Sequence, residues 1–253
     1  MNKQEKIIHR PVIADNSDEF AIDASLPFSQ KEIYNKFTDL SKGVDFLNIV
    51  NSRGVIQTKV TKEQYLIITV DLFLQGLNSQ GHKLTAKNDE IYIYNGSYWE
   101  KVEYDTIKRV LFLVSRKYKV PIYKAKHYSF RDELFKQLMV SIISLNFSED
   151  KPIRINVLNG TIEFSGQDVR LLSFNKDHFL RYQLSFCFDE IAKAPKFQKY
   201  LDEVLPDKTL QLVLAEFIGS IFIKNNAGIK LEKALILTGS GSNGKSVFFE
   251  IIN

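Results

Sequence analysis

The stretch ALILTGSGSNGKS, residues 234–246, is the most informative part of this sequence for fold class. Its apolar run, residues 234–238, suits a buried β-strand, and residues 239–246 match the pattern G-x-x-x-x-G-K-[ST]. Residues 247–252 are mostly apolar and favour a helix. A strand, a glycine-rich loop and a helix in this order predict a phosphate-binding loop, and a chance glycine-rich turn is disfavoured by this context.

The spacing of the loop follows from the chemistry of phosphate binding. Glycines at 239, 241 and 244 let successive backbone N–H groups face inward on an oxyanion, and the following helix directs its positive end at the same charge. The sequence therefore predicts ATP and Mg²⁺ as cofactors, with Lys245 as the catalytic cation and Ser246 as the metal ligand. The predicted nucleotide contacts are Gly239, Ser240, Gly241, Ser242, Asn243, Gly244, Lys245, Ser246 and Val247.

Composition places the chain among globular proteins. Hydrophobic residues make up 44% of the 253 residues and charged residues 25%, and no apolar run reaches the roughly 18 residues needed to cross a bilayer. We expect a cytoplasmic protein. The single cysteine, Cys187, forbids an internal disulfide and is expected to be a buried small hydrophobe between two phenylalanines. A net charge of +4 is too small to indicate nucleic acid unless the cations are clustered.

Before the loop, the sequence predicts an α+β region in several segments. We expect a flexible leader at 1–28, a mostly helical region at 29–150 with one β-hairpin, and a small β-rich section with helices at 151–223. A polar linker at 224–232 then leads into the start of an α/β P-loop domain at 233–253.

The expected elements rest on caps, periodicity and turn residues. Capping boxes predict helices at 29–40 and 65–77, apolar periodicity predicts helices at 105–118, 131–144 and 196–204, and Asp207 is the expected N-cap of a helix at 208–223. Asn95-Gly96 predicts a tight hairpin between strands at 90–94 and 97–102, with positive φ at both residues. Further strands are expected at 153–157, 161–164, 169–173 and 179–186.

Several of these stretches, in this order, carry a resemblance to a known family. They are YNGSYWEKV (94–102), NVLNGTIEF (156–164), KFQKYLDEVLPD (196–207), EFIGSIF (216–222) and LILTGSGSNGKS (235–246). Residues 92–253 resemble the superfamily 3 helicase–primases of phages, plasmids and poxviruses. The resemblance implies an AAA+-like ATPase domain that assembles as a ring, usually a hexamer, and moves along DNA.

The resemblance also sets limits on what this sequence can do. The acidic Walker B strand, sensor asparagine and arginine finger of such helicases would follow Asn253, so we expect this stretch to be an N-terminal part that does not hydrolyse ATP alone. No Asp-x-Asp pair for a primase metal site occurs in the sequence, so primase activity is not expected. Alternatives are another P-loop or AAA+ ATPase, or a non-catalytic DNA-binding or oligomerisation module.

Residues 106–131 form a candidate DNA-binding segment. The segment holds eight lysines and arginines and no acid, with aromatic residues interleaved. Cations for phosphates and aromatic faces for bases are what a single-strand groove requires. The alternative is a solvated helix face whose aromatics belong to the core. The candidate DNA contacts are Arg116, Lys117, Lys119, Tyr123, Lys124, Lys126 and Tyr128.

Overall fold

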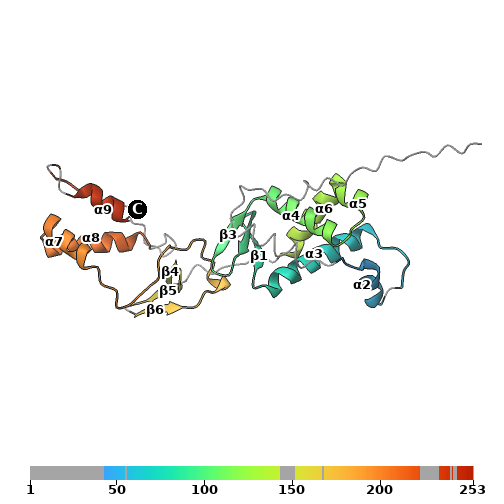
Figure 1. Ribbon diagram of the computed structural model, residues 1–253, viewed down its shortest axis with the longest axis horizontal. Coiled ribbons are helices and arrows are strands. Elements are labelled where there is room, and N and C mark those ends of the chain that lie inside the picture. The colour runs from blue at the N-terminus through green and yellow to red at the C-terminus, as the bar shows by residue number, and fades with distance from the viewer. Residues whose placement is uncertain are drawn as a thin grey trace, which may run out of the picture. The chain divides into compact units, whose positions relative to one another are not determined.

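The computed structural model describes residues 43–54, 56–142, 152–166, 168–222, 234–239, 241 and 244–252. It confirms a mixed α+β fold (Figure 1). The chain divides into two compact units, one of Met1–Gln80 with Glu103–Ile142 and one of Gly81–Val102 with Ile143–Asn253. The expected leader at 1–28, the helix at 29–40 and the linker at 224–232 lie outside the described residues.

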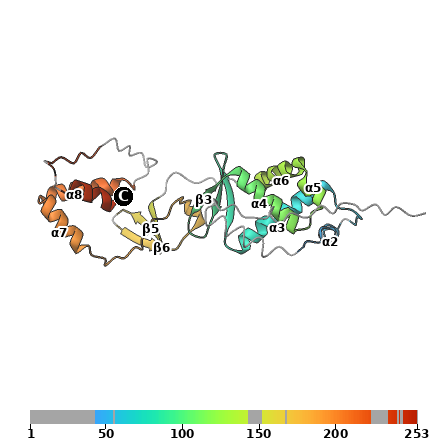
Figure 2. The same ribbon diagram turned by 45° about the horizontal axis from the view of Figure 1, so that its top comes forward.

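The first unit is helical in its described part. Its helices are α2 (Phe46–Ser52), α3 (Lys62–Ser79), α4 (Tyr104–Lys117), α5 (Ile122–Lys126) and α6 (Tyr128–Ser141). Helices α3, α4 and α6 pack side by side (Figure 2). The expected helices at 65–77, 105–118 and 131–144 are confirmed, whereas α2 and the short α5 were not anticipated.

Local signals explain where α3 begins and which face it buries. The Thr61 hydroxyl accepts from the Gln64 backbone N–H, and the Gln64 side chain accepts from the Thr61 backbone N–H, so the expected capping box is present. Val70, Phe73 and Leu77 recur at helical spacing and are almost completely buried. Each such side chain withdrawn from water contributes roughly 1.5–3 kcal/mol to stability.

The second unit contains an antiparallel sheet with the strand order β1-β2-β3. The strands are β1 (Lys83–Lys87), β2 (Glu90–Tyr94) and β3 (Trp99–Val102), so the expected hairpin is confirmed and β1 is an addition. The expected turn geometry is wrong, because only Gly96 of the pair has positive φ (+105°). The Asn95 side chain instead accepts from the backbone N–H groups of Ser97 and Tyr98 at 3.0 Å, which widens the loop to four residues.

A second antiparallel sheet follows in the same unit, with strands β4 (Ile153–Val157), β5 (Gly160–Ser165) and β6 (Asp168–Leu172). These strands confirm three of the expected four. The fourth expectation, a strand at 179–186, is wrong. A 3₁₀ turn, Lys176–His178, precedes an irregular segment that is held beside β4 by isolated bonds such as Leu184 N–H to the Asn156 carbonyl at 2.8 Å.

An aromatic cluster anchors that irregular segment to the first sheet. Trp99 is 1% exposed, as expected of a core residue, and packs with Tyr92, Tyr94 and Phe179. Its indole Nε1–H donates to the Lys176 carbonyl at 2.7 Å. The expectation for Cys187 is wrong, because this cysteine is exposed. Cys187 lies in the irregular segment that follows Lys176–His178, and its neighbour Phe186 is exposed as well.

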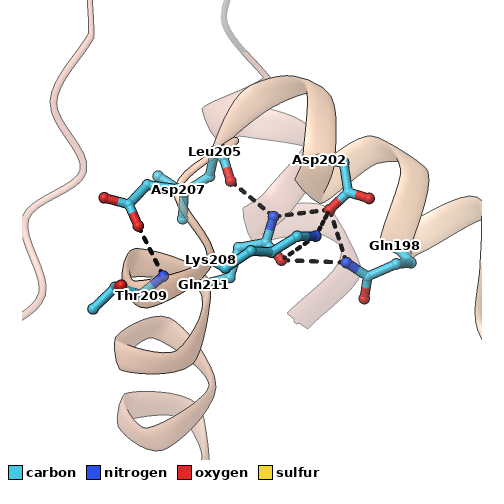
Figure 3. Close-up of polar contacts among 7 residues, drawn as sticks. All are labelled: Gln198, Asp202, Leu205, Asp207, Lys208, Thr209 and Gln211. Carbon is cyan, nitrogen blue, oxygen red and sulfur yellow. Dashed lines mark hydrogen bonds and ion pairs between the residues drawn. The ribbon is translucent and has the colours of Figure 1, made fainter.

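The remaining helices are α7 (Pro195–Val204), α8 (Lys208–Ser220) and α9 (Lys245–Ile252). Asp207 accepts from the Thr209 backbone N–H at 2.8 Å, so the expected N-cap of α8 is confirmed. Beside it, the carboxylate of Asp202 on α7 accepts from Lys208 and from the side chains of Gln211 and Gln198 (Figure 3). These hydrogen bonds hold the end of α7 to the start of α8.

No helix within the described ranges combines the length and the apolar character that crossing a membrane requires.

Candidate functional site

The predicted phosphate-binding loop is described at Gly239, Gly241 and Gly244, and α9 begins at Lys245 directly after it. The expected helix is therefore present. Gly241 has φ of +100° and Gly244 has φ of +80°, a region that residues with a Cβ rarely adopt. The sequence places glycine where the backbone must turn. Ser240, Ser242 and Asn243 lie outside the described residues.

The strand expected before the loop is not observed. Residues 234–239 have no regular structure, and Ile236 is 79% exposed. A strand of this kind is stabilised by parallel neighbours that pair with it and by helices that cover both faces. Within the part of the chain that the structure describes, no strand pairs with this run. The apolar pattern alone therefore does not form the strand.

Helix α7 contacts the loop directly. The Tyr200 hydroxyl donates to the Gly244 carbonyl at 2.7 Å. A Cβ on Gly244 would lie 2.9 Å from Val204 Cγ1 and 3.0 Å from Tyr200 Cε2, closer than such atoms approach. Gly244 is therefore required for both its backbone conformation and this close packing. Tyr200 was not among the expected site residues, because nothing local in the sequence links two positions this far apart.

An apolar cavity of about 260 Å³ adjoins the loop. Residues of α7 and α8, the run 235–238, Phe248 and Lys245 line it. The Lys245 Nζ lies 3.5 Å from the Gly239 carbonyl, so the ammonium points back across the loop toward its first residue. The arrangement brings together a cation, two glycines with positive φ and a helix N-terminus, which are groups that favour an anion.

The candidate DNA segment covers α4 from Thr106 onward, all of α5 and the start of α6. Tyr123 is 85% exposed and Tyr128 is 74% exposed, and Lys119 and Lys126 are also exposed. Arg116, Lys117 and Lys124 are half-buried. In contrast, Phe112, Tyr118 and Phe130 are buried in the core. The segment thus combines an accessible set of cations and tyrosines with aromatics that serve only packing.

Some cations of this segment have structural partners. The Arg131 guanidinium lies 3.8 Å from the centre of the Phe112 ring, and Lys108 pairs with Asp132 at 3.3 Å. The Lys124 Nζ lies 4.4 Å from the centre of the Tyr65 ring. Tyr128 stacks on His127 with ring centres 4.9 Å apart. Arg131 and Lys108 were not among the seven candidate contacts, whereas Lys124 and Tyr128 were.

Comparison with known proteins identifies the region around these sites. No curated protein matches the chain. A family model described as "D5 N terminal like" matches residues 72–206, from the middle of α3 to the end of α7 and beyond it to the α7–α8 corner. This match covers more than half of the 253 residues. The chain therefore belongs to the D5 N terminal like family, whose domain is found in phage and viral primase–helicase proteins.

Proposed function

We propose that this chain is part of an ATP-dependent DNA helicase that acts in phage or plasmid-type replication. The observation that carries the proposal is the order of two features: a D5 N terminal like region at 72–206 is followed by a P-loop motif at 239–246. A region found in primase–helicases, placed before a motif that binds nucleotide phosphates, favours this function over an unrelated P-loop ATPase.

In this proposal the loop binds Mg·ATP. The backbone N–H groups around Gly241 and Gly244 and the start of α9 hold the phosphates, Lys245 contacts the β- and γ-phosphates, and Ser246 ligates Mg²⁺. The metal neutralises phosphate charge. We further propose that the whole protein hydrolyses ATP and forms a homo-oligomeric ring, as the family resemblance implies.

Titration with a fluorescent ATP analogue, with and without Mg²⁺, tests the nucleotide site. Lys245→Ala removes a charge-assisted contact worth about 1.5–3 kcal/mol, so we expect affinity to fall about ten- to 150-fold. Lys199→Ala is the matched control, because Lys199 is an exposed lysine of α7 whose partner is Glu203 of the same helix. Equal binding by the wild type and Lys245→Ala would contradict the assignment of the loop.

The second part of the proposal concerns DNA. The exposed cations and tyrosines of residues 106–131 support binding of single strands through phosphate contacts and stacking, without reading of base edges. The same surface also supports the alternative of a DNA-binding module without catalysis. Binding of DNA by the chain together with failure of every nucleotide test would favour that module.

A further inference from the structure

The helical unit contains a cavity that is separate from the phosphate-binding loop. Its volume is about 390 Å³, which is within the range of sites for small ligands. Its walls come from the start of α2, the start of α3 and the turn after α4. The lining residues are Gly43–Leu47, Val60, Tyr65 and Lys119.

Lys119 is held in this cavity by an unusual backbone. Its N–H donates to the Arg116 carbonyl and the Val120 N–H donates to the Ser115 carbonyl, both at 3.0 Å, which is the Schellman arrangement at a helix end. The residue at the left-handed position of that motif is usually glycine, yet here Lys119 has φ of +65°. A lysine kept in a conformation that disfavours it points to a use for its side chain.

Gly43, which also lines the cavity, leaves room for the Lys119 side chain. A Cβ on Gly43 would lie 2.3 Å from Lys119 Cε and 2.6 Å from Cδ, so any larger residue would displace the lysine stem. The Val44 N–H donates to the Tyr118 carbonyl at 3.3 Å and ties this wall to the end of α4. The Lys119 stem therefore lies along the backbone at the rim of the cavity.

Tyr65 supplies an aromatic surface in the same cavity. Its ring packs edge-to-face on the buried Phe46 at 4.7 Å, which orients it, and the Lys124 Nζ lies over it at 4.4 Å. Of the lysines in the candidate DNA segment, Lys124 thus contacts this half-buried tyrosine, and Lys119 lines the same cavity as the tyrosine. The acid of the lining, Asp45, is engaged by the Asn48 backbone N–H as the N-cap of α2.

We propose that this cavity binds one nucleotide of a single DNA strand, with the base stacked on Tyr65 and its phosphate on Lys119. The stacked base displaces the Lys124 ammonium from the ring and leaves it to a neighbouring phosphate. A cation beside an aromatic face is the combination by which proteins hold single strands. This inference rests on the DNA binding proposed above and assigns it a fixed anchoring point.

The test uses the full chain and fluorescence anisotropy with a labelled single-stranded oligonucleotide at about 0.1 M salt. Lys119→Gly removes the cation and also relieves the left-handed backbone, so the fold should be retained or stabilised. One lost phosphate contact should weaken binding about fivefold. Lys136→Gln, on the exposed face of α6, is the matched control and should change affinity less than twofold.

Tyr65 is tested by a pair of variants. Tyr65→Leu should weaken binding about tenfold, whereas Tyr65→Phe keeps the ring and should bind like the wild type. Thermal unfolding of both variants checks that α2 and α3 stay packed. If the wild type binds DNA but Lys119→Gly and Tyr65→Leu behave like Lys136→Gln, the cavity is not the anchoring point and the DNA function stands. If the wild type binds no DNA, both proposals fall together.

Discussion

Replacing four lysines of the cationic segment by glutamine should change how DNA binding depends on salt. The variant removes Lys117, Lys119, Lys124 and Lys126, of which Lys119 and Lys126 are exposed and the other two half-buried. All four lie within ten residues, at the end of α4, in the turn that follows it and in α5, so one strand can contact them together.

The expected magnitude follows from counterion release. Each phosphate neutralised on a single strand contributes about −0.7 to the slope of log affinity against log salt, so four contacts give a slope of roughly −3. Between 50 and 200 mM salt, the wild type should lose about fifty-fold in affinity. In the variant, only the remaining cations of the surface contribute to the salt dependence of affinity, so its slope should approach zero.

The assay is anisotropy of a labelled oligonucleotide across a salt series, with circular dichroism to check the fold. The matched control replaces four exposed lysines elsewhere, Lys59, Lys136, Lys193 and Lys196, and changes the net charge by the same amount. Its slope should remain near that of the wild type. An unchanged slope in the first variant, or an equal flattening in the control, would show that the segment is only a solvated face.

Three further predictions concern stability. Phe179→Leu should lower the free energy of unfolding by about 1–3 kcal/mol, because Phe179 loses its ring contacts with Tyr92 and Trp99; urea unfolding followed by Trp99 fluorescence measures this. Burial raises the pKa of Tyr118 to about 12, above the ordinary tyrosine value of about 10. Because the unfolded state ionises first, the folded state should lose stability as the pH rises from about 10 through 12. Tyr118→Phe should reduce this loss of stability, which an alkaline titration of unfolding measures. Hydrogen bonds from Lys208, and then from two glutamine side chains, lower the pKa of Asp202 to about 2. The contribution of the Asp202 carboxylate to stability is therefore present above about pH 4 and is lost as the pH falls toward 2. Asp202→Asn should make acid unfolding less steep between these pH values.

Elements set by local chemistry could be predicted from the sequence. The Thr61–Gln64 capping box and the Asp207 cap each involve residues a few positions apart, and each is present in the structure. Strand β4 forms at the expected residues, but its burial does not alternate, because the polar Asn156 is buried together with its neighbours Ile155 and Val157. The strand expected at 179–186 does not form. Its apolar residues pack individually against the aromatic cluster and the second sheet and do not pair with another strand in a ladder of hydrogen bonds. Strand β1 was missed because its turn, Asn88-Asp89, contains no glycine and yet has positive φ at both residues.

The two candidate sites differ in the same way, since one is a local motif and the other is built from segments distant in the sequence. A P-loop motif can be recognised in a sequence because its glycines, lysine and serine lie within eight residues, and its use as a nucleotide site stays a prediction. The cavity at Tyr65 and Lys119 instead depends on three segments brought together by helix packing. The positive φ of Lys119 could not be anticipated either, because the Schellman signal in a sequence is a glycine. Contacts between segments that are distant in the chain produce no periodic pattern in the sequence.

The contact between α7 and the P-loop links the family region to the predicted nucleotide site. The Gly244 carbonyl accepts from the Tyr200 hydroxyl at 2.7 Å and from the Phe248 N–H at 3.1 Å. A peptide group is planar and trans, so a carbonyl held in one direction aims the following N–H in the opposite direction. Tyr200 therefore helps to fix the orientation of the Lys245 N–H, one of the groups proposed to bind phosphate. Since Tyr200 lies within the matched residues 72–206 and Lys245 lies beyond them, this hydrogen bond joins the D5 N terminal like region to the loop, beside the packing of Val204 against Gly244.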